Sequence, residues 1–281
     1  MNLEAPPFNH GIRTPRSQPV IPERALASIC QSIDNLSRLW VKRPLGSENT
    51  MANYRESLAP ANKILFDQLH EWTLGGTHNY GDNFSAIGEL SNQLLRANFN
   101  PLYESTIGAI RHYLCTPHVY YREDCFLPFF RLFDFQHFTQ PYLQDMIQSL
   151  EAPPHFDNVW SSLDWPYGTS FDRTLSFTLA IELPAKGHGL RIMNVYRDPL
   201  SGSLHRMRAT PSNDQINLYD FSNKTPNESY VFSYKAGDIV FHSGHEFHSI
   251  APFTTLTPGD RRITLQGWAV WVPGTGWLIF G

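Results

Sequence analysis

The chain has 281 residues, of which 41% are hydrophobic and 17% are charged, and its formal net charge is −4. This composition is typical of a globular protein, and a chain of this length can bury a sizeable core as one large domain or two small ones. The slightly acidic balance provides no basic field that would attract nucleic acid or anionic lipid, so we expect neither as a partner.

The sequence shows no sign of membrane insertion or secretion. No stretch approaches the roughly 18 uncharged apolar residues of a membrane span, and Met1–Pro7 lacks the cationic start and apolar run of a signal peptide. Cys30, Cys115 and Cys125 are an odd number in no paired spacing, which indicates reduced thiols. We therefore expect a cytoplasmic protein, of an oligomeric state that the sequence leaves open.

Up to residue 117 the apolar residues recur at helical spacing. Pro22 stands where a first helical turn tolerates proline, and Asn100-Pro101 separates two of the candidates. The candidate helices contain Leu26–Trp40, Ile64–Trp72, Ile87–Leu95 and Leu102–Leu114. Residues 1–117 are thus predicted to form a helical N-terminal region.

From residue 118 onward the pattern shortens. Apolar and polar residues alternate over Leu175–Leu183, which predicts a half-buried strand. Further strands are predicted at Val231–Ser233, Ile239–His242 and Arg262–Trp271, with one helix at Pro141–Leu150. Because no long linker divides the chain, we expect a single α+β domain over residues 1–281, with the helical region packed on an antiparallel β core formed by residues 118–281.

The segment His155-Phe156-Asp157 contains the only His-x-Asp of the chain. On an extended backbone, residues i and i+2 share a face, so the imidazole and the carboxylate would point the same way. One further histidine from another strand would complete a facial triad, which leaves positions open on a bound metal. A motif this short often occurs by chance, so the sequence around it has to decide whether it binds a metal.

Three histidines are candidates for the third ligand. They follow the apolar strand Gly237–Phe241, and we expect only one of them to bind metal. Gly244 and Pro252 argue against a helix that would place all three on one face, so a zinc site built from this run alone is disfavoured. The candidates are His242, His245 and His248.

An arginine opens the last predicted strand. Its planar guanidinium can hold a carboxylate through two parallel charge-assisted hydrogen bonds. The sequence offers both Arg261 and Arg262, and Thr264 and Gln266 lie on the same strand face as Arg262. Two more arginines could reach a pocket from neighbouring strands, but a structural salt bridge is the expected role of Arg131 and Arg173.

The order of His-x-Asp, distal histidine and arginine resembles that of the iron- and 2-oxoglutarate-dependent oxygenases, particularly their prolyl-hydroxylase-like branch. Three other stretches are similar to that branch: Arg173–Leu179 with the glycine-rich turn that follows it, Gly237–Phe241, and Arg262–Trp268. The resemblance covers roughly residues 125–280, and the first 115 residues match no family in this way.

The resemblance implies a double-stranded β-helix, or jelly-roll, core and a particular set of ligands. It places Fe(II) on His155, Asp157 and His248, and it implies 2-oxoglutarate as a co-substrate anchored by Arg262 with help from Thr264. The Ser-Ile-Ala-Pro stretch after His248 favours that residue over His245. The spacing to Trp268 favours Arg262 over Arg261.

The same resemblance implies a dioxygenase that hydroxylates an aliphatic C–H bond, with release of succinate and CO₂. Related halogenases replace the metal-binding carboxylate with Gly or Ala. Because Asp157 is present here, hydroxylation, desaturation or ring formation is favoured over halogenation. A small metabolite or an amino acid is the expected substrate, since no peptide- or nucleic-acid-binding module is evident.

Two other functions compete with this interpretation. A cupin-type enzyme would bind Fe(II) without 2-oxoglutarate, and Arg262 argues against it. A non-catalytic β-sandwich binding module, in which the histidines are incidental, predicts no stoichiometric iron.

Overall fold

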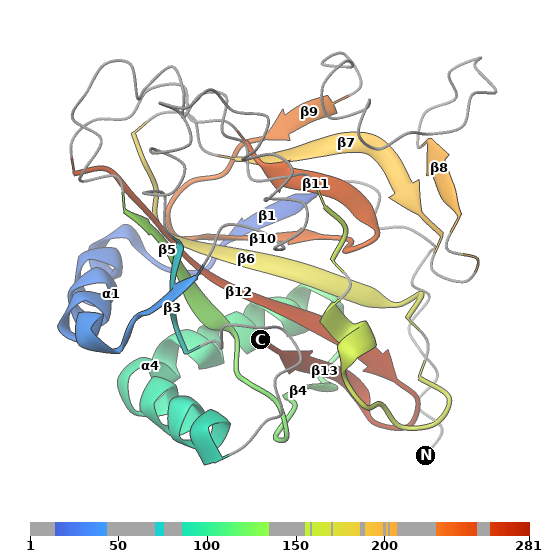
Figure 1. Cartoon of the computed structure of the whole chain (residues 1–281), viewed down its shortest axis with the longest axis horizontal. Coiled ribbons are helices and arrows are strands. Elements are labelled where there is room, and N and C mark those ends of the chain that lie inside the picture. Colours follow the sequence, from blue (N-terminus) through green and yellow to red (C-terminus); the bar gives the residue numbers. More distant parts are fainter. Residues whose placement is uncertain are drawn as a thin grey trace.

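The computed structural model describes residues 15–43, 71–75, 86–134, 155–157, 159–169, 171–185, 189–198, 201, 203–206, 229–251 and 259–281 (Figure 1). The helical elements are α1 (Glu23–Asn35), α4 (Ala86–Tyr113) and the short 3₁₀ turns Ser37–Leu39 and Val159–Ser162. The strands are β1 (Arg16–Pro19), β2 (Val41–Arg43), β3 (Glu71–Leu74), β4 (Val119–Tyr121), β5 (Phe129–Asp134), β6 (Thr174–Glu182), β7 (Leu190–Arg197), β8 (Leu204–Arg206), β9 (Ser229–Phe232), β10 (Asp238–His242), β11 (Glu246–Ile250), β12 (Arg261–Val272) and β13 (Gly276–Phe280).

The described strands form two sheets, which are antiparallel except where β4 pairs with β13. The large sheet has the order β1-β10-β6-β12-β5-β3-β2, and β13 also pairs with β12. The smaller sheet has the order β11-β7-β8, and β9 also pairs with β7. The architecture is therefore mostly antiparallel sheet with few helices.

The two α-helices of the described residues, α1 and α4, cover the outer face of the large sheet. In the core, Ile33 of α1 and Ile110 of α4 are fully buried together with Leu175, Phe177 and Leu179 of β6. Burying each such side chain stabilises the fold by roughly 1.5–3 kcal/mol. Figure 1 shows both helices on the far side of the large sheet from β7 and β11.

The inner face of the large sheet contains polar as well as apolar residues and is buried too. Along β6 the alternate residues Thr174 and Ser176 are only 3% and 2% exposed. The prediction of a half-buried strand at Leu175–Leu183 is therefore wrong, because the smaller sheet covers the inner face while the helices cover the outer one. The contact between the sheets includes Ala180, Leu190, Ile192 and Val240.

The helices predicted around Ile87–Leu95 and Leu102–Leu114 are one kinked helix, α4. The kink lies at Phe99, with φ −132° and ψ 18°, two residues before Pro101. Proline has no N–H to donate, and its ring collides with the preceding turn of a helix. Pro101 therefore perturbs the helix where the sequence indicates a break, but it bends the helix instead of ending it.

The N-terminal region contributes strands as well as helices. β1 pairs with β10 at one edge of the large sheet, and β3 pairs with β5 toward the other edge. Trp72 lies in β3, so the predicted helix Ile64–Trp72 is wrong at that end. Residues 64–70 and the predicted helix Pro141–Leu150 lie outside the described residues.

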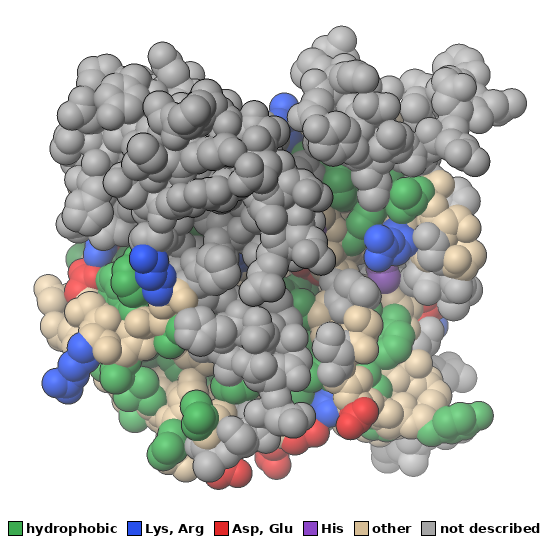
Figure 2. Space-filling view, in the orientation of Figure 1, with side chains coloured by type: hydrophobic (Ala, Val, Ile, Leu, Met, Phe, Trp, Pro, Cys, Tyr) green, Lys and Arg blue, Asp and Glu red, His purple; other side chains and the backbone are tan. Residues whose placement is uncertain are grey.

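Figure 2 shows both acidic and basic side chains among the described residues, with several acidic ones along the lower edge of this face. None of the helices among the described residues is long and apolar enough to cross a membrane.

Candidate metal centre

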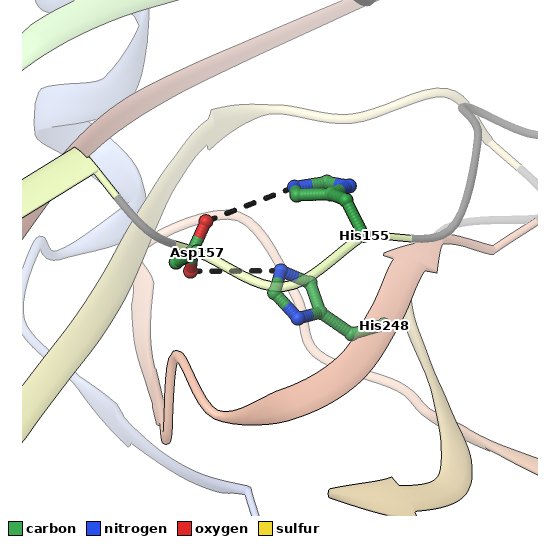
Figure 3. Close-up of side chains that lie close together, drawn as sticks. All are labelled: His155, Asp157 and His248. Atoms are coloured by element: carbon green, nitrogen blue, oxygen red, sulfur yellow. Dashed lines mark ion pairs between the residues drawn. The ribbon is translucent and has the colours of Figure 1, made fainter. Parts of the chain in front are cut away.

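Three predicted ligands converge at one point between the sheets. One nitrogen or oxygen from each of His155, Asp157 and His248 lies within 4.8 Å of the others. His155 and Asp157 come from one extended segment and His248 from β11, and the three side chains point toward one another (Figure 3). The structure thus brings together the residues that the His-x-Asp pattern and the distal histidine predicted.

Backbone hydrogen bonds set the distance between the two histidines. The N–H of His155 donates to the carbonyl of His248 at 2.9 Å, and the N–H of His248 donates to that of His155 at 3.0 Å. This pair forms an isolated antiparallel bridge, so both side chains project from the same face. The main chain therefore places the two imidazoles next to each other.

The carboxylate of Asp157 faces both imidazoles. Its Oδ1 is 3.7 Å from Nε2 of His155, and its Oδ2 is 3.6 Å from Nε2 of His248. The side chains of Asp157 and His248 are 9% and 6% exposed, whereas that of His155 is 48% exposed. The cluster is thus closed on one side and accessible past His155 on the other.

The turn between β10 and β11 positions Asp157. The N–H of Asp157 donates to the carbonyl of Gly244 at 2.9 Å. A Cβ on residue 244 would lie 2.9 Å from Cβ of Asp157 and would also collide with the ring of Trp160. Only glycine allows this close approach.

A second hydrogen bond fixes the tautomer of His248. Its Nδ1 lies 2.7 Å from the carbonyl oxygen of Glu246, which can only accept, so Nδ1 carries the proton. The lone pair of Nε2 then points to Asp157 and the shared centre. This is how metal-binding histidines are usually oriented.

The protonation states of the buried ligands suit metal binding. Burial lowers the pKa of His248 to about 4, against the opposing effect of Asp157. Burial by itself would raise the pKa of Asp157, but His248 and His155 outweigh it and lower that pKa to about 2. At neutral pH the centre therefore offers an uncharged imidazole and an ionised carboxylate, which are the forms that bind metal.

The other two histidines of the run have different surroundings. His245 is buried against Trp160, and its Nε2 lies 2.7 Å from the carbonyl oxygen of Phe171, so it tethers the 159–171 segment. His242 lies on β10 with its ring centroid 4.5 Å from that of His248. His242 thus borders the centre as a buried neighbour.

A cavity of about 360 Å³ opens beside the three ligands. Its size is near the lower end of the range for small-molecule sites. Residues from both sheets line it, including Ser176, Val240, Ile250, Gln266 and Trp268. The wall also contains Tyr234 and Arg131. No pattern in the sequence singles out Tyr234, and Arg131 lines the cavity although a structural salt bridge is the role expected for it from the sequence.

The structure separates the two candidate arginines by their faces. Arg261 points outward and forms ion pairs with Asp34 of α1 at 2.7 Å and Glu182 of β6 at 2.6 Å. Arg262 points inward, is 2% exposed and lines the cavity. Adjacent residues of a strand face opposite sides of the sheet, so only one of them can reach the cavity.

The partners of Arg262 within the described residues are all uncharged. Its NH2 group donates to the hydroxyl of Tyr234 at 3.2 Å, and its NH1 group to that of Thr264 at 3.4 Å. Nε has no hydrogen-bond partner there. Burying an ionised guanidinium without a counter-charge is costly, so this arrangement points to an anion that binds in the cavity.

Next to the centre, Glu246 is a buried carboxyl of a different kind. It is 1% exposed, and among the described residues neither side-chain oxygen has a hydrogen-bond partner. Burial raises its pKa to about 8. The pKa of Glu246 is therefore higher in the folded protein than the value of about 4.5 expected in the unfolded chain.

Because of this shift, we expect Glu246→Gln to raise the stability of the metal-free protein at high pH but not at low pH. Because the pKa is higher in the folded state, the contribution of Glu246 to stability is intact below about pH 4.5 and is lost as the pH rises toward 8. The uncharged amide should make the metal-free protein more stable than the wild type at pH 8, by roughly 2–4 kcal/mol. Urea unfolding of both proteins at pH 4.5 and pH 8 checks this. An equal difference at the two pH values would show that Glu246 does not titrate in this way.

Comparisons with known proteins give a likeness among solved structures alone. No family model matches the chain, and no curated protein is significantly similar to it. An N-substituted L-amino acid dioxygenase from Burkholderia ambifaria is 13% identical, with 95% of this chain and 86% of that chain covered and a TM-score of 0.48. A prolyl-4-hydroxylase from Pseudomonas putida is 15% identical, with 85% and 97% covered and a TM-score of 0.25. The non-heme alpha-ketoglutarate-dependent carbocyclase SnoK is 13% identical, with 93% and 97% covered and a TM-score of 0.33. At these scores, a functional assignment has to rest on the residues of the site.

Proposed function

We propose that the protein is an Fe(II)- and 2-oxoglutarate-dependent dioxygenase that oxidises an aliphatic C–H bond of a small molecule and releases succinate and CO₂. The observation that carries the proposal is the buried guanidinium of Arg262. It lacks a carboxylate partner among the described residues and lines the same cavity as His155, Asp157 and His248. A metal triad and an anion site in one cavity are what a chelating dicarboxylate requires.

The donor set fits Fe(II). Two imidazoles and one carboxylate approach from one side, which leaves positions for a bidentate co-substrate and for O₂. Iron bound there would, together with 2-oxoglutarate and O₂, supply the oxidising power of the reaction. His248 and Asp157 hold their places through hydrogen bonds to the β10–β11 region, while His155 lies at the accessible side.

Arg262 would anchor the distal carboxylate of 2-oxoglutarate. A guanidinium provides a fixed fork of donors, and here Tyr234 and Thr264 hold it by their hydroxyls. This binding would orient the co-substrate toward the triad. The cupin-type alternative needs no such cation and leaves the buried charge unexplained.

The apolar part of the cavity wall would exclude water from the reacting groups. Leu190, Val240, Ile250 and Trp268 contribute it, from both sheets. A dry site strengthens the electrostatic interactions inside it and protects a reactive oxidant from side reactions.

The architecture also supports a more specific proposal for the fold. We assign the two facing sheets to a double-stranded β-helix and the whole chain to a single α+β domain with a helical N-terminal region. Support comes from the metal cluster between the sheets and from the packing of α1 and α4 on the large sheet.

The first test requires no substrate. Fe(II) and then 2-oxoglutarate are added to the metal-free protein without oxygen, and the visible metal-to-ligand charge-transfer band of the chelate is recorded. We expect the band in the wild type and its loss in His155→Ala. His112→Ala, at an exposed position on α4, is the matched control and should keep the band.

Either of two other outcomes would contradict the proposed function. Iron binding without the band would favour a cupin-type enzyme. No iron binding at all would favour a non-catalytic binding module.

A further inference from the structure

Arg262, the proposed anchor of the co-substrate, belongs to a block of side chains from two neighbouring strands. Arg262 of β12 lies opposite Phe133 of β5, and Thr264 lies opposite Arg131. The guanidinium carbons of Arg262 and Arg131 are 5.8 and 5.9 Å from the centroid of the Phe133 ring. The two arginines thus share one aromatic neighbour in the wall of one cavity.

Gln266 connects this block through two hydrogen bonds. Its Oε1 accepts a hydrogen bond from NH1 of Arg131 at 2.8 Å, and its Nε2 lies 3.3 Å from the hydroxyl of Thr264. Since a guanidinium can only donate, the oxygen of the amide has to face Arg131 and the nitrogen has to face Thr264. A guanidinium carries several N–H donors, so Arg131 can hold Gln266 and contact other groups as well. The orientation of the Gln266 amide is therefore fixed by Arg131.

The hydroxyl of Thr264 receives two donors. One is Nε2 of Gln266, and the other is NH1 of Arg262 at 3.4 Å. Both lone pairs of the hydroxyl oxygen are thereby occupied, so its proton has to be donated to a third group. Thr264 is 0% exposed, and none of the described residues accepts that proton. Because an unpaired buried donor is costly, this geometry points to an acceptor on a ligand.

The cavity is where such an acceptor can bind. Arg262 and Gln266, on either side of Thr264 along the same strand face, both line it. Nε of Arg262 is a second buried donor without a partner among the described residues. A carboxylate has enough lone pairs to accept from both donors. In the proposed complex, the distal carboxylate of 2-oxoglutarate is the group at this place.

We propose that Gln266, held by Arg131, directs the proton of the Thr264 hydroxyl toward the distal carboxylate of 2-oxoglutarate. Gln266 is then a positioning residue, which acts on the co-substrate through Thr264 without touching it. Without the amide N–H, one lone pair of the hydroxyl is free, and the hydroxyl can rotate among several directions instead of donating in one. This inference rests on the proposed function, because it takes the acceptor to be the co-substrate.

The test compares two 2-oxo acids that differ at the distal end alone. 2-Oxoglutarate has a carboxylate there, and 2-oxopentanoate has a methyl group. Each acid is titrated into the anaerobic protein loaded with Fe(II), and its Kd is obtained from the charge-transfer band. We expect Gln266→Met, which removes the amide with little change in size, to raise the Kd of 2-oxoglutarate about three- to tenfold. The Kd of 2-oxopentanoate should stay unchanged.

A double-mutant cycle tests whether Gln266 acts through the hydroxyl. Thr264→Val removes the hydroxyl and keeps the shape of the side chain, so it should raise the Kd of 2-oxoglutarate by about tenfold or more. Thr264→Ser keeps the hydroxyl and should stay close to the wild type. In the Thr264→Val background, adding Gln266→Met should change this Kd by less than about twofold, because no hydroxyl is left to direct.

Three results would overturn the inference. An unchanged Kd of 2-oxoglutarate in Gln266→Met would show that the amide does not influence the anchor. An equal rise for both acids would assign Gln266 a general structural role. A rise that persists in full in the Thr264→Val background would show that Gln266 acts without the hydroxyl. A wild type that never shows the band with 2-oxoglutarate refutes the proposed function instead, so the two failures are distinguishable.

Discussion

Asp157→Ala is expected to abolish stoichiometric Fe(II) binding and turnover. Asp157 supplies the only negative charge among the three clustered ligands, and its two oxygens face Nε2 of His155 and of His248. Removing a residue that only hydrogen-bonds to a metal ligand costs roughly 10- to 100-fold in metal affinity, so loss of a ligand itself should cost more. Iron content after desalting and succinate release measure the two effects.

Two further variants separate charge from folding. Asp157→Asn keeps the size of the side chain but removes its charge, and it should lose iron as well. Asp34→Ala removes a carboxylate that pairs with Arg261 on the outer face, so it should keep both iron and turnover. Full activity in Asp157→Ala, in protein with an unchanged circular dichroism spectrum, would remove Asp157 from the ligand set.

Arg262→Met is expected to raise the Kd of 2-oxoglutarate by roughly 30- to 1,000-fold and to leave iron binding intact. Truncating one partner of a buried charge pair costs about 2–4 kcal/mol, which corresponds to that range. The stability of the ligand-free protein should not fall in the same way. Since Arg262 is buried with uncharged partners among the described residues, its replacement should leave stability unchanged or increased. Titration of 2-oxoglutarate by the charge-transfer band and urea unfolding measure the two quantities.

Arg261→Met is the matched control for this prediction. It makes the same change one residue earlier, on the opposite face of β12, where the guanidinium pairs with Glu182 and Asp34. We expect it to lower stability without changing the Kd of 2-oxoglutarate. If the Kd rises in Arg261→Met and not in Arg262→Met, the assignment of the anchor is wrong.

The residues near the centre were predictable because each depends on short-range geometry. His155 and Asp157 share a face because side chains along an extended chain alternate with a period of two residues. The turn residue Gly237 directly precedes β10 and predicts where this strand begins. Arg262 and Gln266 follow from the same period along β12. In these cases the signal and the structure have the same physical cause, which is the alternation of side chains along a strand.

Other features depend on partners that are far away in the sequence. β1 has the sequence RSQP and no apolar alternation, and it joins the sheet through backbone pairing with β10. Arg131 reaches the cavity because β5 pairs with β12 in one particular register. The burial of both faces of β6 depends on the helices and on the smaller sheet. None of these three features produces a pattern among neighbouring residues of the sequence.

The pairing of β11 with β7 makes the position of His248 a matter of strand register. Glu246 pairs with Tyr196 and His248 with Ile192, so β7 contains two more residues than β11 over this interval. An irregularity of two residues keeps every side chain of β11 on its own face, whereas a shift of one would turn His248 outward and Phe247 inward. Within the paired stretches of β7 and β11, insertions and deletions are thus compatible with a metal centre only in even numbers, which limits how these two strands can change during evolution.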